Sequence, residues 1–355
     1  MTDFLAAAEN ARQRGLPHLE AIFRKLAIPA TRLEPIARSK RPRICLVVDH
    51  KGWCGERLFI ELANQLTEYD CRIVRLGDRE HLALDFDLYI YRNAAWLSTC
   101  NLPSWVYKRI VCIVEGHRVL DHGYGKLFPR VRYTVPMTGE LMARVKEYGA
   151  SNVWPETIAN GVSTTEFYPS DKFPKEFTVG AAGNFSIEYY DNWKGFSRYI
   201  VPACQKAEVK LDWCSWRGKC QALPALKGSY IRPDKMTDWY RGLSCLVMMS
   251  QSEGCSGVTF EAMATGLPII STKVGWHGET CKDEIIWTTR PKQETPDSIR
   301  SAVNELAKRL RKLKQDYSLC IAMGKKNRLF AERYSHAQIA DKWRNVIASA
   351  LQPQD

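Results

Sequence analysis

The sequence predicts an α/β protein with two doubly wound, Rossmann-like domains. Short apolar runs alternate with amphipathic helical stretches, which favours parallel sheets covered by helices on both faces. A length of 355 residues suits two hydrophobic cores of ordinary size. A polar stretch punctuated by Gly161 and Pro169 separates two alternating regions, and it indicates a linker. We therefore expect one domain over residues 41–165 and a second over residues 175–330.

The first domain is expected to follow a helical, basic extension, residues 1–40. Contiguous aliphatic residues predict buried strands, and these are placed at 44–48, 72–74, 88–90 and 110–114. A loop with Gly52 and Gly55 and a helix over 57–66 connect the first two strands. The alternation predicts a sheet whose strands all run in parallel.

The second domain has its clearest pattern between residues 245 and 271. The apolar run 245–249 predicts a buried strand, and Ser256 is a suitable N-cap for a helix that runs to Thr265. Gly266 ends that helix, and Pro268 opens the next strand at 269–271. A further helix precedes this pattern at 235–242.

The C-terminal segment, residues 331–355, is predicted to be helical. Between His336 and Leu351 the residues Ile339, Trp343 and Val346 recur at helical spacing on one face.

Composition limits the classes of protein to which the chain can belong. No apolar run approaches the roughly 20 residues that span a bilayer, and we expect no secretory signal. The twelve cysteines form no Cys-x-x-Cys pair, which argues against metal or disulfide frameworks and favours buried thiols in a reducing cytoplasm. A net charge of +12 indicates a polyanionic partner, and a solubilising surface is the alternative.

Residues 250–279 are the most informative part of the sequence. Glu253 and Glu261 flank a small, Gly-containing segment between a buried strand and a helix N-terminus. Free backbone amides and the helix dipole favour an anion at such a position. A carboxylate accepts two hydrogen bonds from a vicinal diol, as in dinucleotide folds. A ligand with both phosphate and hydroxyl groups, such as a nucleotide sugar, fits this pattern.

This segment resembles the donor motif of family 4 glycosyltransferases, which have the GT-B fold of two Rossmann-like domains facing a cleft. The matching string is Glu-x7-Glu followed by Ala-Met-Ala-x-Gly-x-Pro. The resemblance implies that Glu261 binds the donor ribose and that Glu253 faces the transferred sugar. It also implies that the segment Gly254, Cys255, Ser256 and Gly257 cradles the diphosphate. The stretch 160–169 resembles the hinge of these enzymes, and the final helix is expected to cross back onto the first domain.

The same resemblance points to two cations on the donor diphosphate, but only one is found. Lys194 matches the family lysine, whereas Asn184 stands where the family has arginine. Arg198, Arg217 and Arg232 are the candidates to replace that arginine.

Three further positions are expected to contact substrates. Gly52 lies at the place of the family's Gly-rich loop, where the absence of a Cβ permits close approach to the donor. His117 follows a strand at the edge where ligands of α/β sheets lie, and it is predicted to act on the acceptor side. Tyr230, Ile231 and Arg232 are the candidates to meet the nucleobase. The predicted catalytic residues are therefore Glu253, His117 and Lys194.

No metal or cofactor is expected. Asp85-Phe86-Asp87 has the Asp-x-Asp form that binds divalent ions in glycosyltransferases of the other major fold, but nothing else supports that fold. The nucleotide-diphosphate sugar is a co-substrate, and Lys194 with the helix N-terminus would supply positive potential.

The resulting hypothesis is a metal-independent hexosyl- or pentosyltransferase that retains anomeric configuration. The acceptor would be a hydroxyl on a polyanionic or membrane-surface substrate, an envelope glycan or glycolipid. The alternative acceptor is hydroxymethylated viral DNA. A GT-B epimerase or phosphorylase and a non-catalytic nucleotide-sugar binder stay open as well. We expect a cytoplasmic protein, free or peripheral at the inner membrane face or on DNA, with no obligate protein partner.

Overall fold

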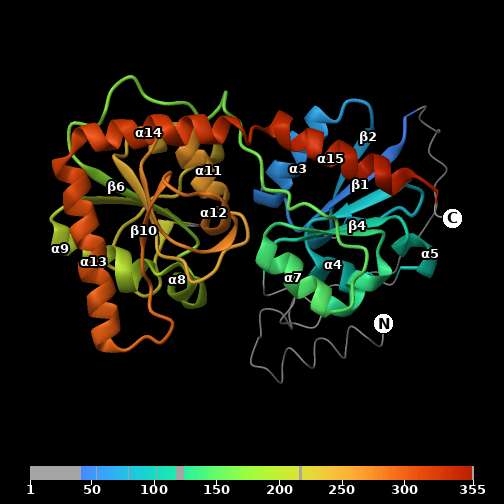
Figure 1. The fold of residues 1–355 in the computed structure, drawn as a ribbon, viewed down its shortest axis with the longest axis horizontal. Helices are drawn as coiled ribbons and strands as arrows, with labels where there is room; N and C mark the ends of the chain where they lie inside the picture. The colour runs from blue at the N-terminus through green and yellow to red at the C-terminus, as the bar shows by residue number, and fades with distance from the viewer. Residues whose placement is uncertain are drawn as a thin grey trace. The chain divides into compact units, whose positions relative to one another are not determined.

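The computed structural model describes residues 41–353, except 53, 79, 101, 117–123 and 216–217, and it confirms an α/β protein with two parallel sheets (Figure 1). The chain divides into two compact units. The first unit comprises Met1–Ala159 and His336–Asp355, and the second comprises Asn160–Ser335. The predicted helical extension, residues 1–40, lies outside the described residues.

The first unit contains a five-stranded parallel sheet in the order β2-β1-β3-β4-β5. Its strands are β1 Arg43–Val48, β2 Asp70–Arg75, β3 Leu88–Tyr91, β4 Ile110–Val114 and β5 Tyr133–Pro136. The helices of this unit are α3 Cys54–Gln65, α4 Ala94–Thr99, α5 Ser104–Tyr107, α7 Gly139–Glu147 and α15 His336–Leu351, with 3-10 helices η1 Leu76–Asp78 and η2 Tyr124–Arg130. Every residue of β1, β3 and β4 is buried, because helices cover both faces of the sheet.

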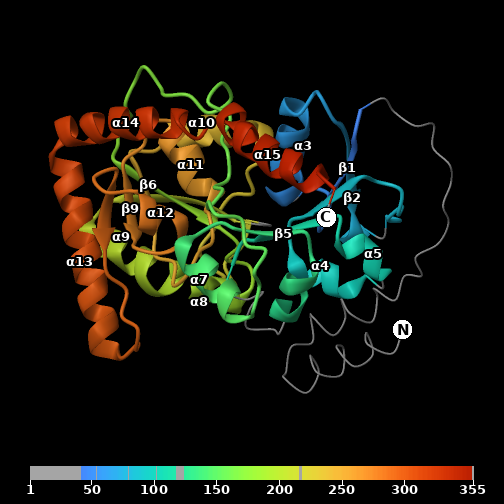
Figure 2. The ribbon, with the colours of Figure 1, turned by 45° about the vertical axis from the view of Figure 1, so that its right-hand side comes forward.

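The second unit repeats this plan, with the sheet order β10-β9-β8-β6-β7. Its strands are β6 Thr178–Gly183, β7 Lys210–Ser215, β8 Cys245–Met248, β9 Ile269–Thr272 and β10 Ile285–Thr288. The helices are α8 Glu188–Lys194, α9 Val201–Ala207, α10 Met236–Arg241, α11 Gly257–Ala264, α12 Gly275–Thr280, α13 Pro296–Gln315 and α14 Tyr317–Glu332, with the π-helical turn η3 Phe196–Ile200 and the 3-10 turn η5 Pro233–Lys235. Helix α13 packs on α9, and α14 packs on α11 (Figure 2).

Both sheets have the doubly wound strand order 2-1-3-4-5 when their strands are numbered within each unit. In this order the winding direction reverses between the first and third strands, and ligands bind outside the carboxyl ends of the strands at that reversal. In the second unit the reversal lies between β6 and β8, which pair through Val179 with Cys245 and Gly180 with Leu246. The topology therefore marks the loops after β6 and β8 as the place for a ligand.

The predicted element bounds differ from the structure mainly at helix starts. Helix α3 begins at Cys54 and not at residue 57, because the Glu56 carboxylate accepts the Gly52 N–H at 2.5 Å and draws the loop into the first turn. The helix expected at 235–242 is a 3-10 turn followed by α10.

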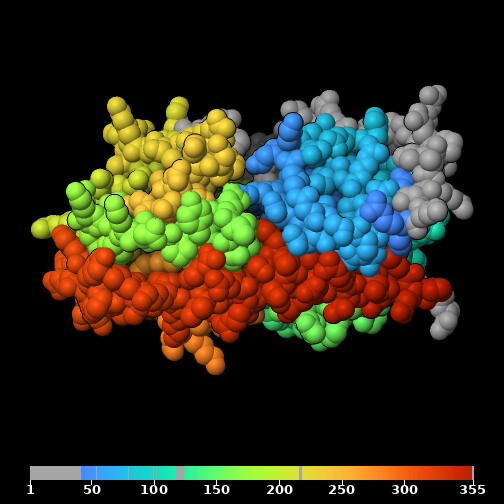
Figure 3. Space-filling view, turned by 90° about the horizontal axis from the view of Figure 1, so that it is seen from above, coloured from blue at the N-terminus to red at the C-terminus, as the bar shows by residue number. Residues whose placement is uncertain are grey.

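The final helix, α15, has the predicted bounds and belongs to the first unit. Ile339, Trp343, Val346 and Ile347 are buried on its inner face. Arg344 fixes its outer side by donating to the Gln65 carbonyl at 2.6 Å and to Glu68 at 2.7 Å. Residues of the C-terminal helices, coloured orange to red, lie at the surface of their units in Figure 3.

The cysteines are free and mostly buried, as the composition predicts. All twelve cysteines are free thiols, and most are buried. Burial raises the pKa of the Cys204 and Cys214 thiols to about 12, so these side chains act as small apolar groups. Within the described residues, no helix is both long enough and apolar enough to cross a bilayer.

Candidate functional site

The loop after β8 opens onto the N-terminus of α11. Ser256 caps this helix, its hydroxyl accepting the Thr259 N–H at 3.4 Å. A Cβ built on Gly257 would meet no atom within 4 Å, so the first helical residue faces open space. The first backbone amides of a helix have no partners within the helix. Together with the helix dipole, they make this position suited to a phosphate group.

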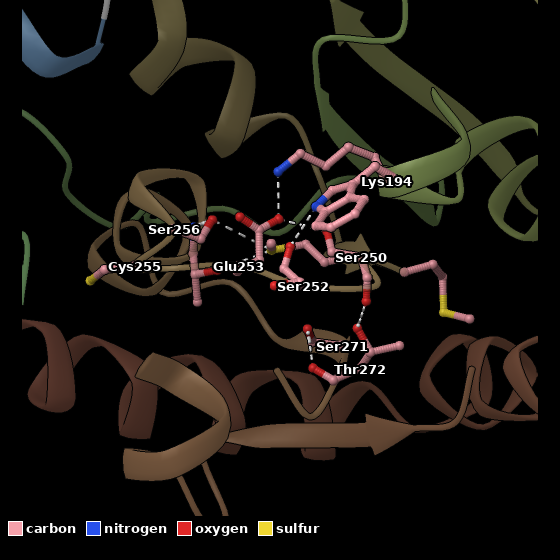
Figure 4. A network of polar contacts seen from close by, with 12 residues as sticks. Lys194, Ser250, Ser252, Glu253, Cys255, Ser256, Ser271 and Thr272 are labelled. Carbon is pink, nitrogen blue, oxygen red and sulfur yellow. Dashed lines mark hydrogen bonds and ion pairs between the residues drawn. The ribbon is translucent and has the colours of Figure 1, made fainter. Parts of the chain in front are cut away.

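Glu253, in this loop, forms an ion pair with Lys194, at the end of α8 (Figure 4). Lys194 ends α8, which follows β6, whereas Glu253 follows β8, so the pair joins the two strands at which the winding reverses. The Glu253 side chain is 12% exposed and also accepts the Ser250 hydroxyl at 2.6 Å. Burial alone raises the pKa of Glu253, but the Lys194 ammonium and the Ser250 hydroxyl outweigh it and hold the pKa below 4.5. Glu253 is therefore a fixed carboxylate and a poor proton donor at neutral pH.

Gly195 allows the two segments that carry this ion pair to lie close together. Gly195 has a φ of +66° and ends α8, and a Cβ there would lie 2.7 Å from the Met249 carbonyl oxygen. The close approach places the end of α8 directly against the end of β8. The Trp193 indole N–H then donates to the Ser252 carbonyl at 2.8 Å, which fixes the loop just before Glu253 (Figure 4).

Arg290 stabilises the same region through hydrogen bonds to its backbone, and it was not among the predicted residues. Its guanidinium is 6% exposed and donates to the carbonyls of Asn192, Trp193 and Met249 at 2.7–2.9 Å. Glu294 accepts from it at 2.7 Å and neutralises its charge. Arg290 follows β10, far from Lys194 in sequence, and nothing in its local pattern distinguishes it from a surface arginine.

The linker also contributes to this loop through Asn160. Its side-chain amide donates to the Cys255 carbonyl at 2.6 Å, and its backbone N–H contacts the Cys255 Sγ at 3.2 Å. Asn160 is only 6% exposed. The first residue of the predicted hinge thus belongs to the second unit and fixes the segment that leads into α11.

Glu261 lies one turn along α11 from Gly257. The Tyr240 hydroxyl donates to its carboxylate at 2.9 Å, which orients the side chain. Tyr230, which is 54% exposed, lies next to the carboxyl end of β7, because Ser229 forms a bridge with Cys214 there. The structure thus brings the segments of Lys194, Glu253 and Tyr230 to one edge of the second sheet.

Comparisons with known proteins agree with this geometry. Residues 176–335 match the family described as glycosyl transferases group 1. A D-inositol 3-phosphate glycosyltransferase of Streptomyces bingchenggensis is 30% identical over 118 residues, covering 33% of this chain and 24% of that protein. An uncharacterized glycosyltransferase of Haemophilus influenzae is 27% identical over 116 residues, covering 33% of this chain and 31% of that protein. The matched segments thus span less than a third of either relative.

Solved structures match nearly the whole chain at low sequence identity. HepE of Anabaena, in complex with UDP and glucose, superimposes with a TM-score of 0.69 at 16% identity, covering 86% of this chain and 99% of that one. Sucrose-phosphate synthase of Thermosynechococcus elongatus gives 0.66 at 16% identity, covering 87% and 100%. This chain has the GT-B glycosyltransferase fold. Its second unit carries the group 1 sequence match, and that unit contains Lys194, Glu253 and Glu261.

Replacement of the arginine expected at Asn184 stays a prediction, and two of its three candidates lie in the described residues. The Asn184 side-chain oxygen accepts from the N–H and the hydroxyl of Ser186, so it stabilises its own turn. Arg198 pairs with Glu294, and the exposed Arg232 pairs with Asp234 at 2.9 Å. Arg217 lies outside the described residues. In the described donor loops, Lys194 is thus the cation next to Glu253.

The predicted residues of the first GT-B unit are only partly described. His117 lies outside the described residues, and its role stays a prediction. Gly52 is exposed with a φ of +77°, and a Cβ there would meet no atom within 4 Å. Its proposed approach to the donor stays a prediction, as does the cleft between the units.

The Asp-x-Asp sequence has a structural role. Asp85 accepts from the Arg43 guanidinium at 2.6 Å, and Asp87 accepts from the Arg43 N–H at 2.8 Å. Across the part of the chain that the structure describes, no group of three or more His, Cys, Asp and Glu side chains is arranged to hold a metal ion. Metal independence stays a prediction.

Replacing Gly275 with alanine is expected to destabilise the protein and displace Glu253. Gly275 has a φ of +63°, and a Cβ would lie 2.6 Å from the Glu253 carbonyl oxygen. We expect a loss of about 1 kcal/mol from backbone strain and about 2 kcal/mol more from the overlap, measured by urea unfolding. Gly149→Ala is the matched control, because Gly149 has a φ of +78° and an open Cβ position. Equal losses in the two variants would show that the contact with Glu253 is unimportant.

Proposed function

We propose that this protein is a glycosyltransferase that moves a sugar from a nucleoside-diphosphate sugar to an acceptor hydroxyl. The observation that carries the proposal is the Lys194–Glu253 pair beside the open N-terminus of α11, at the winding reversal of the second sheet. This arrangement brings an ammonium, free amides and an ionised carboxylate together at the carboxyl ends of β6 and β8. Diphosphate and sugar hydroxyls need these three kinds of group.

Each group then has a definite task. The α11 amides and Lys194 would stabilise the charge that grows on the diphosphate as the glycosidic bond breaks. Glu253, held ionised, would accept hydrogen bonds from hydroxyls of the transferred sugar and orient it. Glu261, positioned by Tyr240, would accept from the ribose diol.

The donor proposed is a UDP-sugar, transferred with retention and without a metal ion. Support for UDP comes from HepE, whose structures are complexes with UDP and glucose, with UDP, and with UDP-glucose. Glu253 is a poor proton donor, because the Lys194 ammonium and the Ser250 hydroxyl outweigh burial and hold its pKa low. A front-face mechanism, in which the leaving phosphate takes the acceptor proton, is consistent with this.

The acceptor proposed is a hydroxyl on an envelope glycan or glycolipid. The net charge of +12 supports a polyanionic acceptor and equally supports hydroxymethylated DNA as the second candidate.

The test is a matrix of labelled UDP-, GDP- and ADP-sugars against acceptors that include extracted glycolipid, envelope glycan and hydroxymethylated DNA, each with and without EDTA. We expect transfer from a UDP-sugar in both conditions, with an α-linked product from an α-linked donor. Inverted product would overturn retention, and loss of transfer in EDTA would overturn metal independence. Release of free or epimerised sugar without transfer would indicate an epimerase, a phosphate requirement would indicate a phosphorylase, and binding without turnover would indicate a nucleotide-sugar binder.

A further inference from the structure

Exposed cations lie at the amino edge of the first sheet. Lys108 and Arg109 immediately precede β4, and Lys126 and Arg130 lie in η2, which leads to β5. Because β4 and β5 are parallel neighbours, the residues that precede them lie at the same edge. All four side chains belong to exposed residues. Within the described ranges, none of the four forms an ion pair with a carboxylate.

On the other half of this edge, the cation at the start of β1 is paired with a carboxylate. Arg43 begins β1, and its guanidinium is paired with Asp85 at 2.6 Å, while Asp87 accepts its backbone N–H. Asp85 and Asp87, which precede β3, thus neutralise the charge of Arg43, the first residue of β1. The segments that lead into β4 and β5, residues 102–110 and 124–133, contain no Asp or Glu.

An exposed tryptophan stands among these cations. Trp105, in α5, is 47% exposed, and the Arg109 guanidinium lies 5.1 Å from its ring centroid. The Arg130 guanidinium lies 4.0 Å from the Tyr107 ring in the same helix. Cation–π contacts hold the Arg109 guanidinium beside the indole and the Arg130 guanidinium beside the Tyr107 ring. An indole next to lysine and arginine matches the amphipathic environment of lipid headgroups.

We propose that this surface, the basic edge formed by Trp105, Lys108, Arg109, Lys126 and Arg130, docks on an anionic lipid bilayer. A single indole with one face covered by Arg109 suits insertion among headgroups better than stacking on successive bases of a nucleic acid. The basic edge also lies at the amino ends of the strands, whereas ligands of α/β sheets bind at the carboxyl ends. The surface thus holds the protein at a membrane and is separate from the donor site. This inference does not depend on the proposed activity.

The test uses the full-length protein and sedimentation with vesicles of phosphatidylcholine and phosphatidylglycerol at 3:1, or of phosphatidylcholine alone. We expect binding only to the anionic vesicles. A cation near an anionic surface contributes about fivefold in partitioning, so K108E/K126E is expected to lower the partition coefficient at least about tenfold. Trp105→Ala is expected to lower it about threefold or more.

The matched control is K308E/K325E, which makes the same change of charge on exposed residues of α13 and α14 in the second unit. Its partition coefficient is expected to change less than about twofold. Equal losses in the two double variants, no vesicle binding by the wild-type protein, or binding only to duplex DNA would each overturn the proposal. Sugar transfer to a soluble acceptor is expected to be the same in K108E/K126E and wild type, so a failure of docking is distinguishable from a failure of the proposed activity.

Discussion

Glu253→Gln is expected to lower the rate of sugar transfer about a thousandfold while leaving UDP affinity within about fivefold. The substitution keeps the shape of the side chain but removes the charge that pairs with Lys194. The sugar then loses its fixed acceptor, and Lys194 loses the partner that positions it. UDP affinity changes little, because the α11 amides and the ribose carboxylate Glu261 are untouched. Single-turnover transfer and calorimetric titration of UDP measure the two quantities separately.

Glu305→Gln is the matched control for this experiment. Glu305 is also a carboxylate with a lowered pKa, paired with Arg309 in α13 and not bonded to Lys194 or Glu253. Its replacement is expected to leave transfer within about twofold. A Glu253→Gln enzyme that transfers sugar at the wild-type rate would remove Glu253 from the mechanism.

The free energy of unfolding is expected to fall as the pH is lowered from about 6.5 to about 4, and His277 is expected to account for about 3 kcal/mol of that loss. His277, in α12, is 1% exposed, and burial lowers its pKa from 6.5 to about 4. Below pH 6.5 the unfolded state binds a proton that the folded state does not. Stability is therefore complete above pH 6.5 and is lost as the pH falls through the folded pKa. Urea unfolding at half-unit pH intervals measures the slope.

His277→Gln is expected to flatten this slope while leaving a smaller acid-induced loss. His336, whose pKa burial and Arg57 also lower to about 4, remains in this variant and accounts for part of the residual slope. His336→Gln provides the complementary control, in which the His277 contribution is retained. Identical slopes in wild-type protein and His277→Gln would show that His277 titrates normally in the folded state.

The sequence predicts the fold because local patterns and topology agree in this chain. Strand β4 has the predicted bounds, and α15 has the predicted ends, since an uninterrupted apolar run and a regular amphipathic face are both local properties. Ser256 and Gly266 also limit α11 as expected, because capping depends on neighbouring residues alone. The start of α3 differs because the bond between Glu56 and Gly52 depends on the folded loop.

The residues that meet in the candidate site were recognisable in part for the same reason. Lys194 and Glu253 each stand in a motif that the sequence displays, but their ion pair depends on the parallel pairing of β6 with β8. Arg290 could not be predicted, because its partners include backbone carbonyls of α8 and of the residue after β8, both distant in sequence. Asn160 was interpreted as part of a hinge, and only the folded chain shows its bonds to Cys255.

The sequence by itself determined the α/β class, the two sheets and the segment that opens onto α11, because these follow from periodicity, capping and local motifs. Only the tertiary structure decided that Glu253 is ionised against Lys194, that Asn184 stabilises its own turn, and that the Arg109 guanidinium lies over the Trp105 ring. Charge, burial and hydrogen bonding at these positions depend on residues far apart in the chain. The physical reason is that electrostatic environment is set by distance in space, which the order of residues does not record.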